Sequence, residues 1–194
     1  TEVLPSSQVY ALEENTVMGG LYIGTGNGAL VWNGNTATSL TTGGNWVVQP
    51  SQHFDFVFDG STTYSATNIG VCKYIQTTIQ DCLNNQDGMP NWGVYSIGMN
   101  SSTVFGGTNS GVGLIDKTSF TVTDTWEAGE ETDNALVEVI GDVAYIGLNG
   151  IGVARYDIPN NEWLTTWTEN NVLDPGNEDV TGLIADFRPG HIWV

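Results

Sequence analysis

A phrase of similar residues recurs along this chain at intervals of about forty positions. Each copy has an aromatic residue, a short stretch of small or apolar residues, a polar turn with glycine, and an apolar strand. The four full copies open at Tyr22, Tyr64, Phe105 and Tyr145, which are 42, 41 and 40 positions apart, and a fifth contains Trp193, 48 positions further on. Repeats of this length are typical of architectures in which each unit packs on its neighbours.

The turn inside each copy also keeps its spacing. A glycine follows the aromatic residue by six positions in the first three copies, at Gly28, Gly70 and Gly111. In the fourth copy the interval from Tyr145 to Gly152 is seven positions, so its turn carries one extra residue. This regularity indicates that the copies share one supersecondary structure.

Each unit predicts four short strands. In the fourth unit, apolar and polar residues alternate over 135–140, 143–147, 152–157 and 162–168, as half-buried strands require. Glycine, asparagine and proline stand between these segments, for example Gly141-Asp142 and Asn149-Gly150, and such pairs favour hairpin turns. No helical periodicity is present.

Four strands in each repeat of about forty residues predict an all-β fold, a β-propeller. A flat sandwich would not repeat at a fixed period, and a parallel β-helix would have shorter coils. We expect about four four-stranded blades plus the first two strands of a fifth, hence a partial propeller in one arc. The expected blades cover 7–50, 53–90, 92–130 and 134–170, with the partial blade at 178–194.

Charge excludes some partners. The chain has 194 residues with 22 acidic and 4 basic side chains, which gives a formal net charge of -18. Such a chain repels phosphate, so nucleic acid is excluded as a partner and anionic membrane surfaces are disfavoured. No apolar run approaches the roughly 18 residues that cross a bilayer, and residues 1–7 lack the pattern of a signal peptide.

The two cysteines, Cys72 and Cys82, leave two interpretations open. They form a small disulfide, which implies an oxidising compartment, or they are two free and partly buried thiols. Together with the acidic, lysine-poor composition, the first interpretation predicts an extracytoplasmic protein, either periplasmic or extracellular.

Three polar residues at the end of the third strand of a unit, Asn33, Asp116 and Asp157, are expected to stabilise the following turn. We interpret His53 and His191 as surface residues at strand ends. Six of the seven tryptophans, at positions 32, 46, 92, 126, 163 and 167, are expected to pack within or between blades, because tryptophan buries a large area. The alternative is a sugar-stacking surface.

Catalytic and metal-binding patterns are largely absent from the sequence. Gly-x-Ser-x-Gly does not occur, no Cys and His residues have zinc-ligand spacing, and Gly24, Gly26 and Gly28 lie between two strands rather than before a helix. The sialidase box Ser-x-Asp-x-Gly-x-x-Trp is also missing. A calcium site is the one metal site with support, because Asp174, Asn177 and Asp179, beside Glu178, place oxygen ligands in one loop; a solvated acidic loop is the alternative.

The stretch 145–194 resembles the repeats of two-component regulator propellers, which are sensory ectodomains. The matching residues are Tyr145, Ile146, Gly147, Tyr156, Asp157, Asn171, Leu173, Val180, Leu183, Asp186, Gly190, Ile192 and Trp193. A weaker resemblance to kelch repeats lies in Tyr156-Asp157, Trp163 and the pair Gly106-Gly107. Both resemblances imply a propeller without catalytic residues, and the first implies ligand or signal sensing outside the cytoplasm.

We therefore expect a non-catalytic propeller module that binds a small molecule, a carbohydrate or a protein, as part of a sensory or surface protein. The alternatives are a fragment of a carbohydrate-active enzyme, either a glycosidase or a lyase, and a structural repeat array. A cleft with paired carboxylates and an exposed tryptophan would favour the enzyme. Because an arc leaves open edges, we also expect a homo-oligomer or the remainder of a longer propeller as partner.

Overall fold

The computed structural model describes residues 4–42, 49–127, 135–168, 173, 180–185 and 192–194. The first sheet contains β1 (Val9–Asn15), β2 (Gly20–Thr25), β3 (Gly28–Trp32) and β4 (Ala37–Ser39). The second contains β6 (His53–Asp59), β7 (Thr62–Thr67), β8 (Gly70–Ile75) and β9 (Thr78–Leu83), and a 3₁₀ turn, η1 (Asn85–Asp87), follows it. The strands of both sheets follow one another as antiparallel meanders.

The next two sheets repeat this plan. The third contains β10 (Val94–Met99), β11 (Thr103–Thr108), β12 (Gly111–Asp116) and β13 (Thr121–Glu127). The fourth contains β14 (Leu136–Ile140), β15 (Val143–Leu148), β16 (Gly152–Asp157) and β17 (Glu162–Trp167). A two-stranded sheet follows, made of β18 (Ile184–Ala185) and β19 (Ile192–Trp193).

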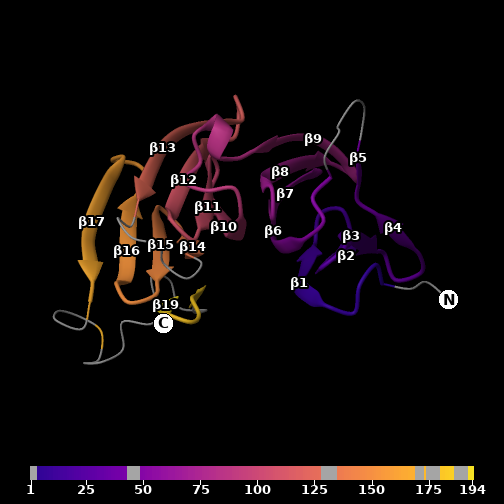
Figure 1. Cartoon of the computed structure of the whole chain (residues 1–194), viewed down its shortest axis with the longest axis horizontal. Coiled ribbons are helices and arrows are strands. Elements are labelled where there is room, and N and C mark those ends of the chain that lie inside the picture. The colour runs from indigo at the N-terminus through magenta and orange to yellow at the C-terminus, as the bar shows by residue number, and fades with distance from the viewer. Residues whose placement is uncertain (1–3, 43–48, 128–134, 169–172, 174–179, 186–191) are drawn as a thin grey trace.

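The sheets are propeller blades arranged in an arc, as the repeat predicts. Figure 1 shows them following one another in chain order, from the indigo N-terminal blade to the orange fourth blade. The first strand of each blade is innermost: β1 lies against β6, β6 against β10, and β10 against β14. The predicted all-β, partial propeller is confirmed.

The second blade departs from the four-strand plan. The short strand β5 (Thr41–Thr42) pairs in parallel with β9, so this sheet has five strands. The backbone N–H of Thr41 donates to the carbonyl oxygen of Thr77 at 2.8 Å. The chain leaving the first blade is thereby attached to the outer edge of the second.

The threonine in the repeated phrase closes the turn between the second and third strands. The hydroxyls of Thr25, Thr67 and Thr108 donate to the carbonyl oxygens of the glycines that begin the third strands, Gly28, Gly70 and Gly111, over 2.8–2.9 Å. The same three hydroxyls accept backbone N–H groups from within the turn. In the fourth blade Leu148 takes this place, and the longer turn is closed by the N–H of Ile151 donating to the Leu148 carbonyl.

The turn after the third strand is also held by a side chain, as predicted. Oδ1 of Asn33, Asp116 and Asp157 accepts a backbone N–H three residues on, at 2.8, 2.7 and 3.2 Å. Hydrogen bonds from Ser119 hold the pKa of Asp116 below its usual value. These residues act in turn formation.

The larger clusters of the core lie between neighbouring blades. Tyr22 of the first blade packs on Phe56 and Phe58 of the second. Trp126 of the third blade contacts Trp163 of the fourth, with ring centroids 5.6 Å apart, which confirms the inter-blade packing expected for these two residues. No helix among the described residues is long and apolar enough to cross a membrane.

Candidate functional site: a cavity between the inner strands

A cavity of ≈ 380 Å³ lies where the inner strands of all four blades converge. Its lining comes from the ends of β1, β6, β10 and β14 and from the turn that follows β1. The volume lies within the range of small-molecule sites, about 300–1,000 Å³. The centre of the arc therefore offers one concave space to which every blade contributes.

Asn15 positions the turn that forms one wall. Its Oδ1 accepts the backbone N–H groups of Val17 and Met18 at 3.0 and 2.9 Å. Its Nδ2 donates to the carbonyl oxygen of Gly60 in the second blade at 3.2 Å. This buried amide therefore both shapes the wall and joins two blades.

Asp55 links the inner strands beside the cavity. Its Oδ2 accepts the backbone N–H of Ile97 in the third blade at 3.0 Å and the hydroxyl of Ser96 at 3.3 Å. The Ser96 hydroxyl in turn accepts the N–H of Val137 in the fourth blade at 3.1 Å. Asp55 and Ser96 occupy equivalent register positions, opposite Ala66 and Gly107, so the same inter-blade bond is made twice.

Burial raises the pKa of Asp55 to about 6, and this effect outweighs the hydrogen bonds from Ile97, Phe56 and Ser96, which favour the charged form. Nearby Glu13 raises the pKa further. Asp55 thus changes its charge at about pH 6, although it links the second blade to the third.

Two more carboxylates, Glu13 and Glu138, line the cavity. Desolvation raises the pKa of Glu138, and the charges of Asp55 and Glu13 raise it further; desolvation also raises the pKa of Glu13. Glu13 and Glu138 hold the same register position in their blades, opposite Tyr22 and Tyr145. The residues that line the cavity in the described structure include no lysine or arginine, so its field is negative.

The three basic side chains that the structure describes make their contacts outside the cavity lining. Lys117 Nζ lies 2.8 Å from Asp59 Oδ2 and donates to the Asn100 carbonyl. Arg155 stacks on Trp167, and Lys73 lies over the Phe120 ring at 5.3 Å. The carboxylates of the cavity are therefore left without a basic counterpart from these three side chains.

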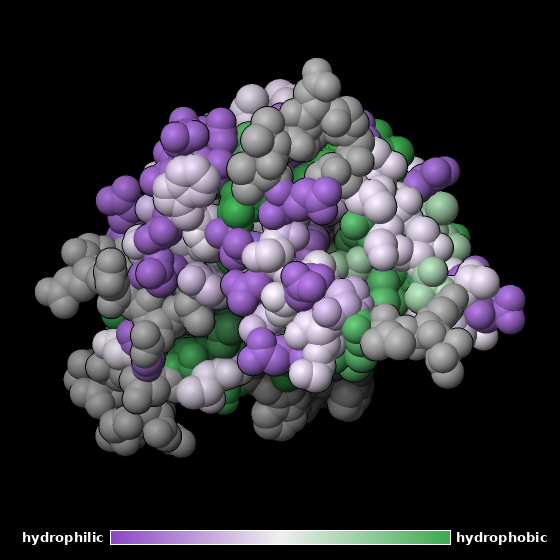
Figure 2. Space-filling view, turned by 45° about the vertical axis from the view of Figure 1, so that its right-hand side comes forward, coloured by the Kyte–Doolittle hydropathy of each residue, from purple (hydrophilic) through white to green (hydrophobic). Residues whose placement is uncertain are grey.

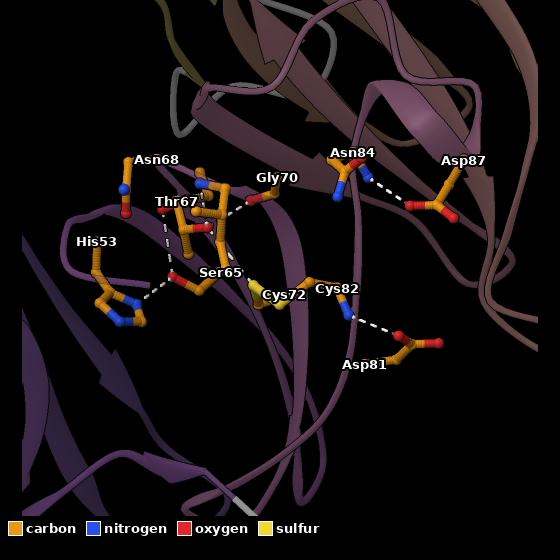
Figure 3. The surroundings of a disulfide bond; sticks show 12 residues. His53, Ser65, Thr67, Asn68, Gly70, Cys72, Asp81, Cys82, Asn84 and Asp87 are labelled. Atoms are coloured by element: carbon orange, nitrogen blue, oxygen red, sulfur yellow. Dashed lines mark hydrogen bonds between the residues drawn. A yellow bond between two sulfur atoms is a disulfide. The ribbon is translucent and has the colours of Figure 1, made fainter. Parts of the chain in front are cut away.

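His53 corrects a sequence-based expectation. The sequence predicts a surface residue before a strand, but His53 begins β6 and is only 2% exposed. Its Nδ1 lies 2.9 Å from Ser65 Oγ, and burial lowers its pKa to about 4. Figure 3 shows the imidazole ring directed toward the Ser65 side chain. The ring packs against Phe56 and Tyr74 of the same blade, contacts that the sequence does not reveal.

Cys72 and Cys82 are joined by a disulfide between β8 and β9 (Figure 3). They are direct cross-strand partners, which brings their sulfurs together without a change in the strands. The bond lies inside the second blade and contributes to an apolar cluster with Tyr74 and Ile79.

The remaining predicted site residues lie outside the described residues or, where described, do not line the cavity. The calcium candidates Asp174, Asn177 and Asp179, with Glu178, lie outside the described residues, as do His191 and Trp46. Among the residues that are described, no three His, Cys, Asp or Glu side chains are grouped as a metal site requires. Trp92 is exposed, contrary to the packing expected for it, and does not line the cavity.

Sequence reasoning missed Glu13, Asp55, Ser96 and Glu138. One signal was available, because Asp55 and Glu138 interrupt otherwise apolar first strands, His-Phe-Asp-Phe-Val-Phe and Leu-Val-Glu-Val-Ile. A charged residue at such a position either faces solvent or serves a site. The choice depends on which strand is innermost, and that is a property of the assembled arc.

Comparison with known proteins gives information about the fold of this chain and none about its chemistry. No protein-family model matches the chain, and no curated protein matches it. Solved structures do match. The extracellular domain of a hybrid two-component system from B. thetaiotaomicron has a TM-score of 0.70 and 15% identity over 95% of this chain and 27% of that one.

Two further matches are the computationally designed protein Ika8 and the WD40 domain of Neurospora crassa Pan2. Ika8 has a TM-score of 0.67 and 16% identity, over 95% of this chain and 54% of its own. Pan2 has a TM-score of 0.63 and 13% identity, over 82% and 49%. The chain thus spans about half of these two chains and about a quarter of the two-component extracellular domain. Taken together, the blades and these likenesses show that the chain folds as part of a β-propeller like those of two-component extracellular domains and WD40 repeats.

Proposed function

We propose that this chain is a non-catalytic binding module of an extracytoplasmic sensory or surface protein, and that it binds a small ligand in the cavity between its inner strands. The cavity carries this proposal, because it is concave, of ligand size and formed by all four blades. A ligand there contacts every blade, so its binding can bias how the blades pack.

Two observations support a location outside the cytoplasm. The Cys72–Cys82 disulfide suits an oxidising compartment, since cytosolic thiols are kept reduced. The extracellular domain of a two-component system is among the similar structures, although at 15% identity this likeness extends to the fold alone.

The charge of the cavity indicates the class of ligand. Carboxylates accept hydrogen bonds and attract cations, and the described lining offers no basic group to an anion. We infer a ligand that presents an ammonium group or several hydroxyls, as an amino sugar does.

Calorimetry with three matched monosaccharides tests this inference. Glucosamine, glucose and glucuronic acid share one ring and carry a positive, a neutral and a negative group. We expect glucosamine to bind most tightly and glucuronic acid not to bind, because the cavity is acidic. Glu138→Gln should weaken glucosamine binding by roughly tenfold, since a charge-assisted hydrogen bond contributes about 1.5–3 kcal/mol.

The matched control is Asp142→Asn, which removes an exposed carboxylate outside the cavity lining and should leave binding unchanged. Equal binding of all three sugars would contradict the assigned ligand class. Absence of binding by glucosamine and glucose, in a folded wild-type chain, would remove the support for the cavity as the site.

A carbohydrate-active enzyme is the second candidate, because Glu13 and Glu138, two carboxylates with raised pKa values, line one cavity. The described lining contains no tryptophan, the other feature that would favour an enzyme. Incubation with chitosan oligosaccharides distinguishes the two functions. A binding module leaves the chains intact, whereas an enzyme shortens them and loses that activity in Glu138→Gln.

A further inference from the structure

Two neighbouring inner strands are joined where a side chain of one accepts a hydrogen bond from the backbone of the next. Ser96 on β10 accepts the N–H of Val137 through its neutral hydroxyl. Asp55, at the same register position on β6, accepts the equivalent N–H, that of Ile97, through its carboxylate. Ala11 holds this position on β1 and has no polar side-chain atom. A neutral side chain is therefore sufficient for the joint, and Asp55 adds a charge that the construction does not require.

The carboxylate of Asp55 holds two parts of the cavity wall. Its Oδ2 accepts the backbone N–H of Ile97 on β10 at 3.0 Å, and its Oδ1 accepts that of Phe56 on β6 at 2.8 Å. Ile97 and Phe56 both line the cavity between the inner strands. One ionisable group thus positions the backbone of two strands at the point where they form the wall.

The surroundings of Asp55 differ from those of most acidic groups in this chain. Most acidic side chains that the structure describes are exposed, and hydrophilic residues cover much of the face in Figure 2. Asp55 lies between the inner strands instead, where it accepts the hydroxyl of the buried Ser96. The loss of water around its carboxylate raises its pKa to about 6, so the charged form costs free energy in the closed joint.

The charges around Asp55 are negative. Glu13 on β1 raises the pKa of Asp55 further, and the charge of Asp55 in turn raises the pKa of Glu138 on β14. None of the described strands packed against β6, which are β1, β2, β7 and β10, carries a lysine or arginine. His53, on β6 itself, has a pKa of about 4 and is neutral near pH 6. The remaining titratable side chains of β6 and of these strands are Glu14, Asp59, Tyr10, Tyr22, Tyr64 and Tyr95. Tyrosine is neutral near pH 6, so no positive group offsets the charge of Asp55.

We propose that Asp55 is a proton-responsive clasp in the cavity wall, which closes the joint between the second and third blades when it is neutral and loosens the joint when it is charged. Opening lets water reach the carboxylate and moves it away from Glu13, so the charged form favours the open joint. The wall at Ile97 and Phe56 therefore responds to the pH around the protein. The inference concerns the wall itself and stands whether or not the proposed ligand binds there.

The direction of the response follows from proton linkage. The pKa of Asp55 in the closed joint lies above its ordinary value of 3.8, so the closed joint binds a proton that the open joint releases. The contribution of Asp55 to closure is fully present below pH 3.8 and is lost as the pH rises through 6. With an ordinary pKa in the open joint, the equilibrium constant for opening rises by roughly tenfold between pH 5 and pH 7.5.

Amide hydrogen exchange, followed by NMR between pH 5 and pH 7.5, tests the proposal. After correction for the intrinsic exchange rate, the opening constant of the Ile97 amide should rise by roughly tenfold over this range, because this amide donates to Asp55. The amide of Ala135 is the matched control within the same chain. It donates to the Thr108 carbonyl across the next joint, at 3.0 Å, and its opening constant should stay unchanged.

Two variants identify the responsible group. Asp55→Asn keeps an oxygen that accepts the Ile97 N–H and removes the charge, so the pH dependence at Ile97 should disappear. Glu13→Gln removes a charge that raises the pKa of Asp55, so the rise in the opening constant should move to lower pH. Asp142→Asn also removes one charge, from an exposed position in the turn between β14 and β15, and should leave the transition in place.

Three outcomes overturn the proposal. An opening constant at Ile97 that does not change with pH would mean that the charge of Asp55 leaves the joint closed. An equal rise at Ala135 would mean that the whole chain responds and not this joint. A pH dependence that persists in Asp55→Asn would assign the response to another group. Thermal unfolding verifies that each variant folds, and if Asp55→Asn does not fold, the displaced transition in Glu13→Gln decides the assignment.

Discussion

Thr25, Thr67 and Thr108 show why the repeated phrase has its spacing. One hydroxyl both accepts from the turn and donates across it, so the turn must have a fixed length. The fourth blade has leucine at this place and one residue more. The period in the sequence thus reflects local hydrogen bonding, which is why the amino-acid sequence alone is enough to predict it.

His53 and Asp55 titrate in opposite directions. Burial lowers the pKa of His53 from 6.5 to about 4, so its contribution to stability is present above pH 6.5 and is lost as the pH falls toward 4. The pKa of Asp55 rises from 3.8 to about 6, so its contribution is present below pH 3.8 and is lost as the pH rises through 6. Each amounts to roughly 3 kcal/mol, so the two largely cancel in the wild type.

In the variant Asp55→Asn, the loss of stability that His53 causes at low pH should no longer be offset. Relative to the wild type, this variant should lose roughly 2–3 kcal/mol of unfolding free energy between pH 7 and pH 4, because the folded state no longer takes up the Asp55 proton. Urea unfolding at a series of pH values measures this difference. The exposed Asp142→Asn serves as control and should follow the wild type. If Asp55→Asn also follows the wild type, Asp55 titrates normally in the fold.

At the scale of the blade, close approach between sheets determines which residues are small. Gly107 has no Cβ, and the carbonyl oxygen of Ala135 occupies the space that a Cβ would need. Ala66 holds the equivalent position in the second blade. The strand conformation at this position therefore accepts alanine. Position 107 requires glycine because the next blade lies so close to it.

Gly107→Ala should destabilise the chain by about 1–3 kcal/mol, because the third and fourth blades must move apart. Thermal unfolding measures the loss. Gly182→Ala is the matched control, since a Cβ at Gly182 meets no atom within 4 Å. An unchanged midpoint for Gly107→Ala would show that the two blades separate at little cost.

The elements themselves were largely predictable. The strands expected in the fourth unit at 143–147 and 152–157 correspond to β15 and β16 within one residue, because alternation and turn residues are local signals. The strand β5 was missed, since its two threonines carry no pattern and pair only because β9 lies beside them. The prediction for His53 was wrong because its ring contacts Ser65, Phe56 and Tyr74, and these residues become its neighbours only in the assembled sheet.

At the scale of the whole molecule, the excess of negative charge opposes compaction. With 22 acidic and 4 basic residues, folding brings like charges together, and few basic side chains offset them. Salt screens this repulsion, because the Debye length falls from about 30 Å at 0.01 M to about 8 Å at 0.15 M. Stability should therefore depend on ionic strength more than it does in a balanced protein.

We expect the unfolding midpoint to rise by several degrees between 0.01 M and 0.5 M NaCl, at a protein concentration where one mass is present throughout. A variant with Glu127→Gln, Asp142→Asn and Glu162→Gln, all exposed, should show a smaller rise because it carries less charge. A midpoint that falls with salt would indicate that attractive pairs dominate instead.

The sequence by itself determined the repeating unit of this protein: its four-stranded blades, its turns and its net negative charge. These follow from local hydrogen bonding, side-chain alternation and summed charge, none of which requires knowledge of distant contacts. Only the tertiary structure decided that the first strands converge, that Glu13 and Glu138 line the same cavity as Ile97, and that the side chain of Leu12 is exposed to solvent. Those properties arise where different blades meet, and residues some forty positions apart become neighbours only when the arc is assembled.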